Sequence, residues 1–158
     1  MTSHSAISAE EAADRLAIRE LIDAYARCAD RRDAEGQKAL FTPDTRFVVY
    51  MAGEDGGPTD DLRGRESLTP VFANLNTYET TTHFNGQSTV ALDGDRATGE
   101  TYCLAHHVYP ADGERKLMIA ALRYQDTFAK TEGAWRFAER RLYVRWIETR
   151  TLEAAAVA

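Results

Sequence analysis

Three short turns divide the second half of the chain into four segments with the composition of β-strands. Each turn contains a glycine, and the turns lie at 93–95, 111–113 and 132–133. The segments around them are rich in β-branched and aromatic residues and cover 80–92, 97–109, 116–130 and 135–149. Such segments pair as antiparallel hairpins when tight turns join them. The pattern therefore predicts a four-stranded antiparallel meander, which any fold of this chain must accommodate.

The first part of the chain has helical periodicity instead. Ser8 and Glu11 have the spacing of a capping box. A stripe of apolar residues follows at spacings of one to four residues: Leu16, Ile18, Leu21, Ile22, Tyr25 and Ala29. This stripe predicts a helix that ends near Asp30. Asp33 is then expected to cap a short second helix that ends near Phe41.

The order of the elements indicates the fold class. Residues 45–50 predict a strand, residues 53–61 an acidic surface loop, and residues 68–75 a third helix that starts near Pro70. Helices thus come first and hairpins second, which predicts the α+β class: a cone-shaped, curved, antiparallel (mixed) sheet with the N-terminal helices packed on one face. We expect a single domain over residues 1–158, with loose termini at 1–8 and 151–158.

Charge and composition argue against several classes of partner. The chain has 158 residues, with 25 acidic against 19 basic side chains and a net charge of −6. Because it has no Lys/Arg tract to contact phosphates, we expect no nucleic-acid partner. Its apolar runs are shorter than the roughly 20 residues that cross a bilayer, and its N-terminus lacks the features of a signal peptide. We therefore expect no membrane partner and a cytoplasmic protein.

Asp30 and His83 are the residues best suited to proton transfer. His83 and Asn85 have the same parity on a predicted strand, so both side chains point to one face. Asp30 stands in the last turn of the first helix, where the helix dipole disfavours a carboxylate, so something should compensate its charge. One interpretation is that Asp30 pairs with Arg31, Arg32 or solvent. The other is that it accepts a hydrogen bond from His83 and makes that histidine more basic.

Other side chains could complete such a site. His106 and His107 are adjacent, so strand alternation turns one of them inward in either register. Tyr25 and Tyr50 could each bring a phenol into the cavity and polarise a substrate carbonyl. Buried tyrosines more often only pack and satisfy their hydroxyl groups. These residues are therefore candidates rather than an assembled site.

Motifs for other chemistry are missing from the sequence. The chain has no motif of a nucleotide-binding, serine-hydrolase or zinc-protease site, so we expect no cofactor and no metal. A metal site of His83, His106 and Asp30 is the lower-ranked alternative, since two histidines and a carboxylate can form a facial triad. Cys28 and Cys103 do not have the spacing of a redox or zinc motif and are expected to be small buried side chains.

The last predicted strand indicates an assembly. It mixes arginines with large aromatic side chains, namely Trp135, Phe137, Tyr143 and Trp146. Aromatic and arginine side chains are typical of interface cores, whereas a monomer would cover one sheet face with short polar residues. We therefore expect a homo-oligomer, either a dimer or a trimer. If these side chains line the cavity instead, Arg145 becomes a substrate contact.

Several segments resemble the SnoaL-like branch of the nuclear transport factor 2-like superfamily, and within it the scytalone dehydratase-like proteins. The similar segments are 26–30, 82–86, 104–109, 133–137 and 144–148. The resemblance implies a cone-shaped α+β barrel in which His83 and His106 are the acid/base histidines and Asp30 orients His83. It also implies that Tyr50 polarises the substrate carbonyl and that Tyr25 lies in the pocket.

Asn85, Leu122, Tyr124 and Arg145 are the candidate substrate contacts. Leu122 and Tyr124 stand where scytalone dehydratases carry Ser and Asn, which argues against scytalone itself as the substrate. We expect a cofactor-independent lyase, a dehydratase that acts on a small cyclic or polyketide-like carbonyl compound. The open alternatives are a ketosteroid-isomerase-like isomerase or a cyclase, and a non-catalytic ligand-binding or accessory subunit.

Overall fold

The computed structural model describes residues 6–154. Its helices are α1 (Ala9–Asp30), α2 (Ala34–Ala39) and α3 (Thr69–Ala73), with 3₁₀ turns η1 (Glu54–Gly56), η2 (Arg65–Leu68) and η3 (Asn74–Thr77). Its strands are β1 (Phe41–Tyr50), β2 (Asp60–Arg63), β3 (Thr80–Asp93), β4 (Arg96–Ala111), β5 (Glu114–Thr131) and β6 (Ala134–Thr151). The strands form one sheet in the order β2-β1-β6-β5-β4-β3.

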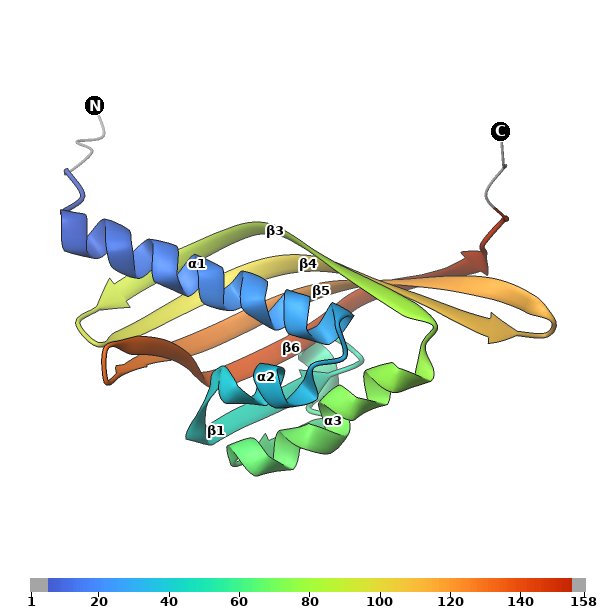
Figure 1. The fold of residues 1–158 in the computed structure, drawn as a ribbon, viewed down its shortest axis with the longest axis horizontal. Helices are drawn as coiled ribbons and strands as arrows, with labels where there is room; N and C mark the ends of the chain where they lie inside the picture. Colours follow the sequence, from blue (N-terminus) through green and yellow to red (C-terminus); the bar gives the residue numbers. More distant parts are fainter. Residues whose placement is uncertain (1–5, 155–158) are drawn as a thin grey trace.

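The predicted meander is confirmed in β3 to β6, which pair antiparallel in chain order. β1 adds to the free side of β6 in parallel, and β2 pairs antiparallel with β1, so the sheet is mixed. The predicted surface loop at 53–61 is wrong at its end, because the β2 strand starts at Asp60. Helices followed by a curved mixed sheet confirm the α+β class (Figure 1).

Irregularities in strand pairing curve the long strands. The register shifts between Asn85 and Ser88 on β3, and at two places along the β5–β6 pair. An extra residue in one strand bends that strand and increases its twist. Each extra residue also reverses which later side chains face inward, and this decides several positions in the candidate site.

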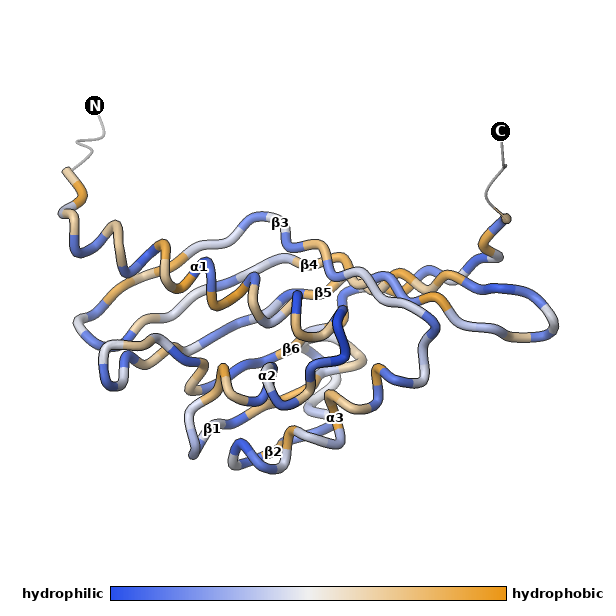
Figure 2. The backbone as a smooth tube through the Cα atoms, in the orientation of Figure 1, coloured by the Kyte–Doolittle hydropathy of each residue, from blue (hydrophilic) through white to orange (hydrophobic). Residues whose placement is uncertain are grey.

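The α1 helix lies across the concave side of the sheet, which we call the inner face (Figure 1). The Ser8 side chain caps it by accepting a hydrogen bond from Glu11 N at 3.1 Å. Figure 2 shows apolar and polar segments alternating along this helix. The predicted stripe is buried from Ile18 to Ala29. Leu16 was wrongly included in the stripe, since it is 60% exposed.

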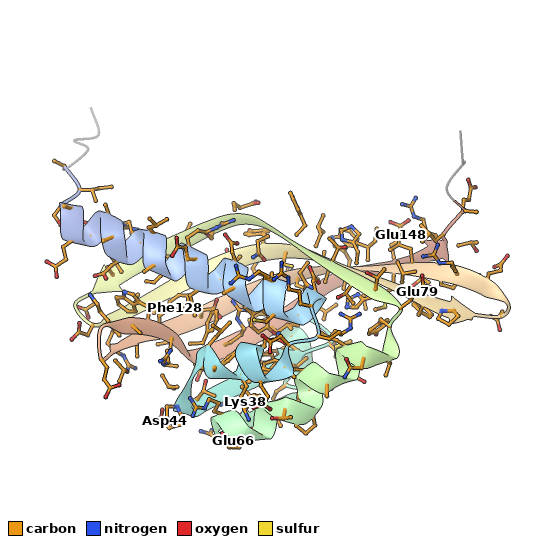
Figure 3. All side chains as sticks on the ribbon, in the orientation of Figure 1. Lys38, Asp44, Glu66, Glu79, Phe128 and Glu148 are labelled. Carbon is orange, nitrogen blue, oxygen red and sulfur yellow. The ribbon has the colours of Figure 1, made fainter. Side chains whose placement is uncertain are left out.

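Two shorter helices close one end of the inner face. Asp33 caps α2 as predicted and accepts a hydrogen bond from Gly36 N at 2.8 Å. The helix ends at Ala39, before the predicted Phe41, because Phe41 begins β1 and is fully buried. Lys38 joins α2 to η2 through Glu66 at 2.9 Å, and both side chains are labelled in Figure 3. The predicted third helix is one α-helical segment between two 3₁₀ turns.

The core lies between α1 and the inner face. Its fully buried rings include Phe41, Phe128 (labelled in Figure 3) and Phe137. Of the loose termini predicted at 1–8 and 151–158, residues 1–5 and 155–158 lie outside the described residues, whereas Ser8 caps α1 and Thr151 ends β6. Within 6–154, no helix is both long and apolar enough to cross a membrane.

Candidate active site

The side chains of Asp30 and His83 meet at the end of α1. Nδ1 of His83 lies 2.7 Å from Oδ1 of Asp30. The backbone N–H of His83 donates to Oδ2 of the same carboxylate at 2.9 Å, and the Thr81 hydroxyl donates to Oδ1 at 3.0 Å. The carboxylate therefore accepts hydrogen bonds from both the backbone and the side chains of β3.

Local sequence explains this geometry. Asp30 is the last residue of α1, and α1 packs along the edge strand β3. Thr81 and His83 are two residues apart on β3, so both side chains point to the inner face and toward the helix end. Asn85, two residues further, donates from its side-chain amide to Asp23 Oδ1 at 3.0 Å. Asn85 therefore ties β3 to α1 next to the Asp30–His83 pair.

The pair is largely enclosed. The His83 side chain is 8% exposed and that of Asp30 is 27% exposed. Burial alone would raise the pKa of Asp30, but hydrogen bonds from the His83 side chain, the His83 backbone and Thr81 hold this pKa below its ordinary value. A carboxylate at this distance can accept a hydrogen bond from Nδ1 of His83, an arrangement that favours the tautomer with its proton on Nδ1.

His107, rather than His106, shares the inner face with His83. Its ring centroid is 5.8 Å from that of His83, and the Tyr78 ring covers it at 4.6 Å. Burial, with a smaller effect from nearby His83, lowers the pKa of His107 to about 4. Its Nδ1 is buried and has no hydrogen-bond partner among residues 6–154. His107 is therefore a neutral side chain at neutral pH that lies beside His83.

A buried arginine forms a second polar cluster on the inner face. Arg140 is fully buried and makes two 2.8 Å hydrogen bonds to Asp126. Its guanidinium lies over the rings of Tyr124 at 3.9 Å and Tyr25 at 4.2 Å. Although burial opposes the charge of Arg140, Asp126 holds its pKa above the ordinary value. Tyr25 and Tyr124 thus enclose Arg140, and burial raises the pKa of each tyrosine.

Cys103 connects these two clusters. It lies on the inner face of β4, paired with Asn85 on one side and Leu122 on the other. Burial raises the pKa of its thiol to about 11, and the charges of both Arg140 and Asp30 act on it. Cys103 is the small buried side chain that the sequence predicts. The two clusters therefore lie within electrostatic reach of one thiol.

The comparisons with known proteins agree with this architecture. A family model described as the SnoaL-like domain matches residues 10–141. The chain belongs to this family. The matched range includes Asp30, His83 and Arg140, and the resemblance expected from the sequence is confirmed for the family.

Relatives and solved structures extend the SnoaL-like comparison. An uncharacterized protein of Mycobacterium tuberculosis is 30% identical over 138 residues, which is 86% of this chain and 88% of that protein. A putative scytalone dehydratase of Novosphingobium aromaticivorans has a TM-score of 0.72 at 21% identity, over 92% of this chain and 95% of that one. A hexachlorocyclohexane dehydrochlorinase of Novosphingobium barchaimii has a TM-score of 0.69 at 17% identity, over 92% of each chain. At these identities the two structures establish the shared fold.

Three of the candidate site residues do not lie on the inner face near His83. His106 lies on the opposite, outer face, where its Nδ1 is 3.2 Å from the Thr82 carbonyl oxygen. Tyr50 is also on the outer face and stacks on Tyr143 with ring centroids 4.5 Å apart. Arg145 is the extra residue of a bulge and borders an outer-face pocket.

The outer positions also rule out the alternative metal triad. His106 and the Asp30–His83 pair lie on different faces of the sheet, so the three side chains do not converge. More generally, residues 6–154 contain no group of three His, Cys, Asp or Glu side chains placed to hold a metal ion.

Leu122, the remaining candidate substrate contact, is buried on the inner face opposite Cys103.

Sequence reasoning missed Thr81, Arg140 and the role of Arg32. Thr81 has the same strand parity as His83, which was an available signal. Arg140 gave no signal, because a charged residue among apolar strand residues is more often exposed. Arg32 donates to the Thr81 hydroxyl at 2.7 Å and not to Asp30 directly, so the predicted pairing of Asp30 with arginine is indirect.

Proposed function

We propose that this SnoaL-like protein is a cofactor-independent lyase, a dehydratase that acts on a small cyclic or polyketide-like carbonyl compound. The observation that carries the proposal is the 2.7 Å contact between His83 Nδ1 and Asp30 Oδ1 in a largely enclosed position. A carboxylate that holds Nδ1 protonated makes Nε2 a general base directed away from the carboxylate.

The proposed reaction uses His83 twice. Nε2 takes the proton from the carbon next to the substrate carbonyl, and the electron pair of that C–H bond forms an enolate. The enolate restores the carbonyl as the C–O bond to the β-hydroxyl breaks. The hydroxyl leaves as water with the proton that the imidazolium returns, so the products are water and an α,β-unsaturated carbonyl compound.

Other inner-face groups support this chemistry. His107 lies beside His83 on the inner face, with ring centroids 5.8 Å apart, and in the proposed reaction its imidazole hydrogen-bonds a substrate oxygen. Ala105 pairs with His83 and Ala120 pairs with Ala105, so the two side chains directly across the sheet from the imidazole are methyl groups. These features favour a compact, partly apolar substrate. Dehydration and dehydrochlorination, named for the two structural neighbours, are both eliminations of HX.

An ultraviolet assay tests the proposal. Cyclic β-hydroxy ketones of increasing size are incubated with the protein, and formation of the conjugated enone is followed by its absorbance. We expect turnover of at least one member and a loss of roughly 10²- to 10⁴-fold for His83→Ala. His106→Ala is the matched control, because this histidine is on the outer face, and it should retain activity. Absence of turnover across the series, or an active His83→Ala, would contradict the proposal.

A further inference from the structure

The carboxylate of Asp30 lies at the C-terminal end of α1, where the helix dipole is unfavourable for a negative charge. Carbonyl groups point out of the C-terminus of a helix, and their dipoles repel a nearby anion. Asp30 is nevertheless held with a pKa below its ordinary value. The groups that oppose this repulsion therefore have to be close to the helix end.

Arg32 and Thr81 form a hydrogen-bond chain that ends on Asp30. Nη1 of Arg32 donates to the Thr81 hydroxyl at 2.7 Å, and this hydroxyl donates to Asp30 Oδ1 at 3.0 Å. A guanidinium group can only donate, so the hydroxyl oxygen must accept from it. The single hydroxyl proton of Thr81 is then directed to Asp30. Thr81 is 5% exposed, so water has little access to compete for this proton.

The backbone of Arg32 adopts a conformation that favours glycine, so an arginine at this position needs a compensating interaction. Its φ angle is 60°, in the left-handed region where glycine is the usual residue after a helix. A side chain at this position carries a conformational cost of roughly 1 kcal/mol or more. The guanidinium offsets that cost by donating to the Ala29 carbonyl oxygen at 3.0 Å as well as to Thr81. It thereby places a positive charge at the helix end, one hydroxyl group away from Asp30.

We propose that Arg32 and Thr81 are positioning residues of the Asp30–His83 pair. They hold Asp30 ionised and oriented so that neutral His83 keeps its proton on Nδ1 and presents Nε2 as the base. This inference rests on the proposed proton-transfer role of His83. Neither residue touches the substrate in this account, and both act through Asp30.

Nitrogen NMR of the histidine rings tests the inference without a substrate. The ¹⁵N shifts of neutral imidazole distinguish the Nδ1–H tautomer from the Nε2–H tautomer, which free histidine favours. The protein is measured at pH 8.5, where an ordinary histidine is neutral. Thr81→Val removes the hydroxyl group and keeps the side-chain shape, whereas Thr81→Ser keeps the hydroxyl. Arg32→Gly suits the φ angle of 60°, and Arg31→Gly is the matched control at an exposed neighbour.

We expect wild-type His83 to be mainly the Nδ1–H tautomer. Thr81→Val and Arg32→Gly should lose this majority, while Thr81→Ser and Arg31→Gly should retain it. If Thr81→Val does not fold, Arg32→Gly still tests the inference, because glycine readily adopts the φ angle of 60° at position 32. Unchanged tautomer populations in folded Thr81→Val and Arg32→Gly would overturn the inference, even if stability fell. A wild-type Nε2–H tautomer would instead contradict the pair itself, so the two failures are distinguishable.

A kinetic readout follows once a substrate is known. Removal of the Thr81 hydroxyl should lower kcat with little change in KM. The reason is that His83 is then misplaced as the base, while the residues that contact the substrate are unchanged. We expect a decrease of roughly 10- to 100-fold for Thr81→Val and rescue by Thr81→Ser. An unchanged kcat in Thr81→Val would also overturn the inference.

Discussion

His83 lies against Asp30 with its Nδ1 atom 2.7 Å from Oδ1, although 53 residues separate the two in sequence. One residue ends a helix and the other lies on the edge strand of a sheet, so only the packing of α1 on β3 brings them together. The backbone N–H of His83 donates to the same carboxylate at 2.9 Å. The pair is therefore fixed by main-chain as well as side-chain geometry.

Acid should destabilise the protein through His107. Its pKa is lowered to about 4 in the folded protein, against an ordinary value of about 6.5 in the unfolded chain. As the pH falls from 6.5 to 4, the unfolded chain binds a proton that the folded protein does not. Folding therefore loses at most about 3 kcal/mol over this window. Urea unfolding of wild type and His107→Leu at pH 7 and pH 5 measures the loss.

The replacement of His107 by leucine provides the check. His107→Leu should show a smaller difference in unfolding free energy between the two pH values than the wild type. Equal pH dependence in both proteins would show that His107 is not held neutral by burial.

Asp126→Asn should strongly destabilise the protein. Asp126 and Arg140 have fully buried side chains, and removal of one partner leaves a buried charge without compensation. Such losses cost about 3–5 kcal/mol. The matched control is Glu79→Gln, which breaks the pair of Glu79 with Arg115, whose side chains are 45% and 48% exposed. The control should change the free energy of unfolding very little. Equal effects of the two substitutions would contradict this prediction.

Much of the fold and part of the candidate site could be predicted from the sequence. The turns specified the meander, and the capping residues specified the starts of α1 and α2. Asp30 and His83 were identified because a helix-end carboxylate and an inward strand histidine are local features. The sequence did not predict which strand of the meander β1 would join, because the parallel pairing of β1 with β6 depends on long-range packing.

The position of His106 on the outer face has a specific physical cause. The β3–β4 turn pairs Asp93 with Arg96, and this register, continued without interruption, would pair His83 with His106. The bulge between Asn85 and Ser88 shifts the register by one residue, so His83 pairs with Ala105 instead. A one-residue shift exchanges the two faces of a strand, and His107 turns inward.

Bulges also explain the errors on β6. The predicted aromatic surface divides, because Trp135 and Phe137 are buried on the inner face while Tyr143 and Trp146 belong to the outer face. A register shift at Thr127/Phe128 changes the parity between Phe137 and the residues that follow. The number and place of bulges cannot be derived from alternation alone, since alternation is what they interrupt.

The outer face should carry the interface of a homo-oligomer. Phe84, Leu104 and Trp146 are 67%, 38% and 51% exposed and border a pocket of about 490 Å³ on this face. Light scattering should give a mass of a dimer or trimer at micromolar concentration, and Trp146→Glu should lower it. Leu16→Glu, at a 60% exposed position on α1, should leave the mass unchanged. A wild-type protein with the monomer mass would refute this prediction.

Chelation should leave the proposed activity intact. Proton transfer by His83 and Asp30 needs no metal, since an imidazole can both remove and return the proton. Dialysis against EDTA followed by the enone assay measures this directly. Loss of activity after dialysis, with recovery on addition of one metal ion, would refute cofactor independence.

Deuterium exchange tests the central claim, that His83 with Asp30 removes a proton next to a carbonyl. A cyclic ketone without a leaving group is incubated with the protein in D₂O, and loss of its α-proton signal is followed by ¹H NMR. The account predicts exchange by wild type and His106→Ala, and a decrease of roughly 10²-fold or more for His83→Ala and Asp30→Asn. Exchange at the wild-type rate by folded His83→Ala would contradict it.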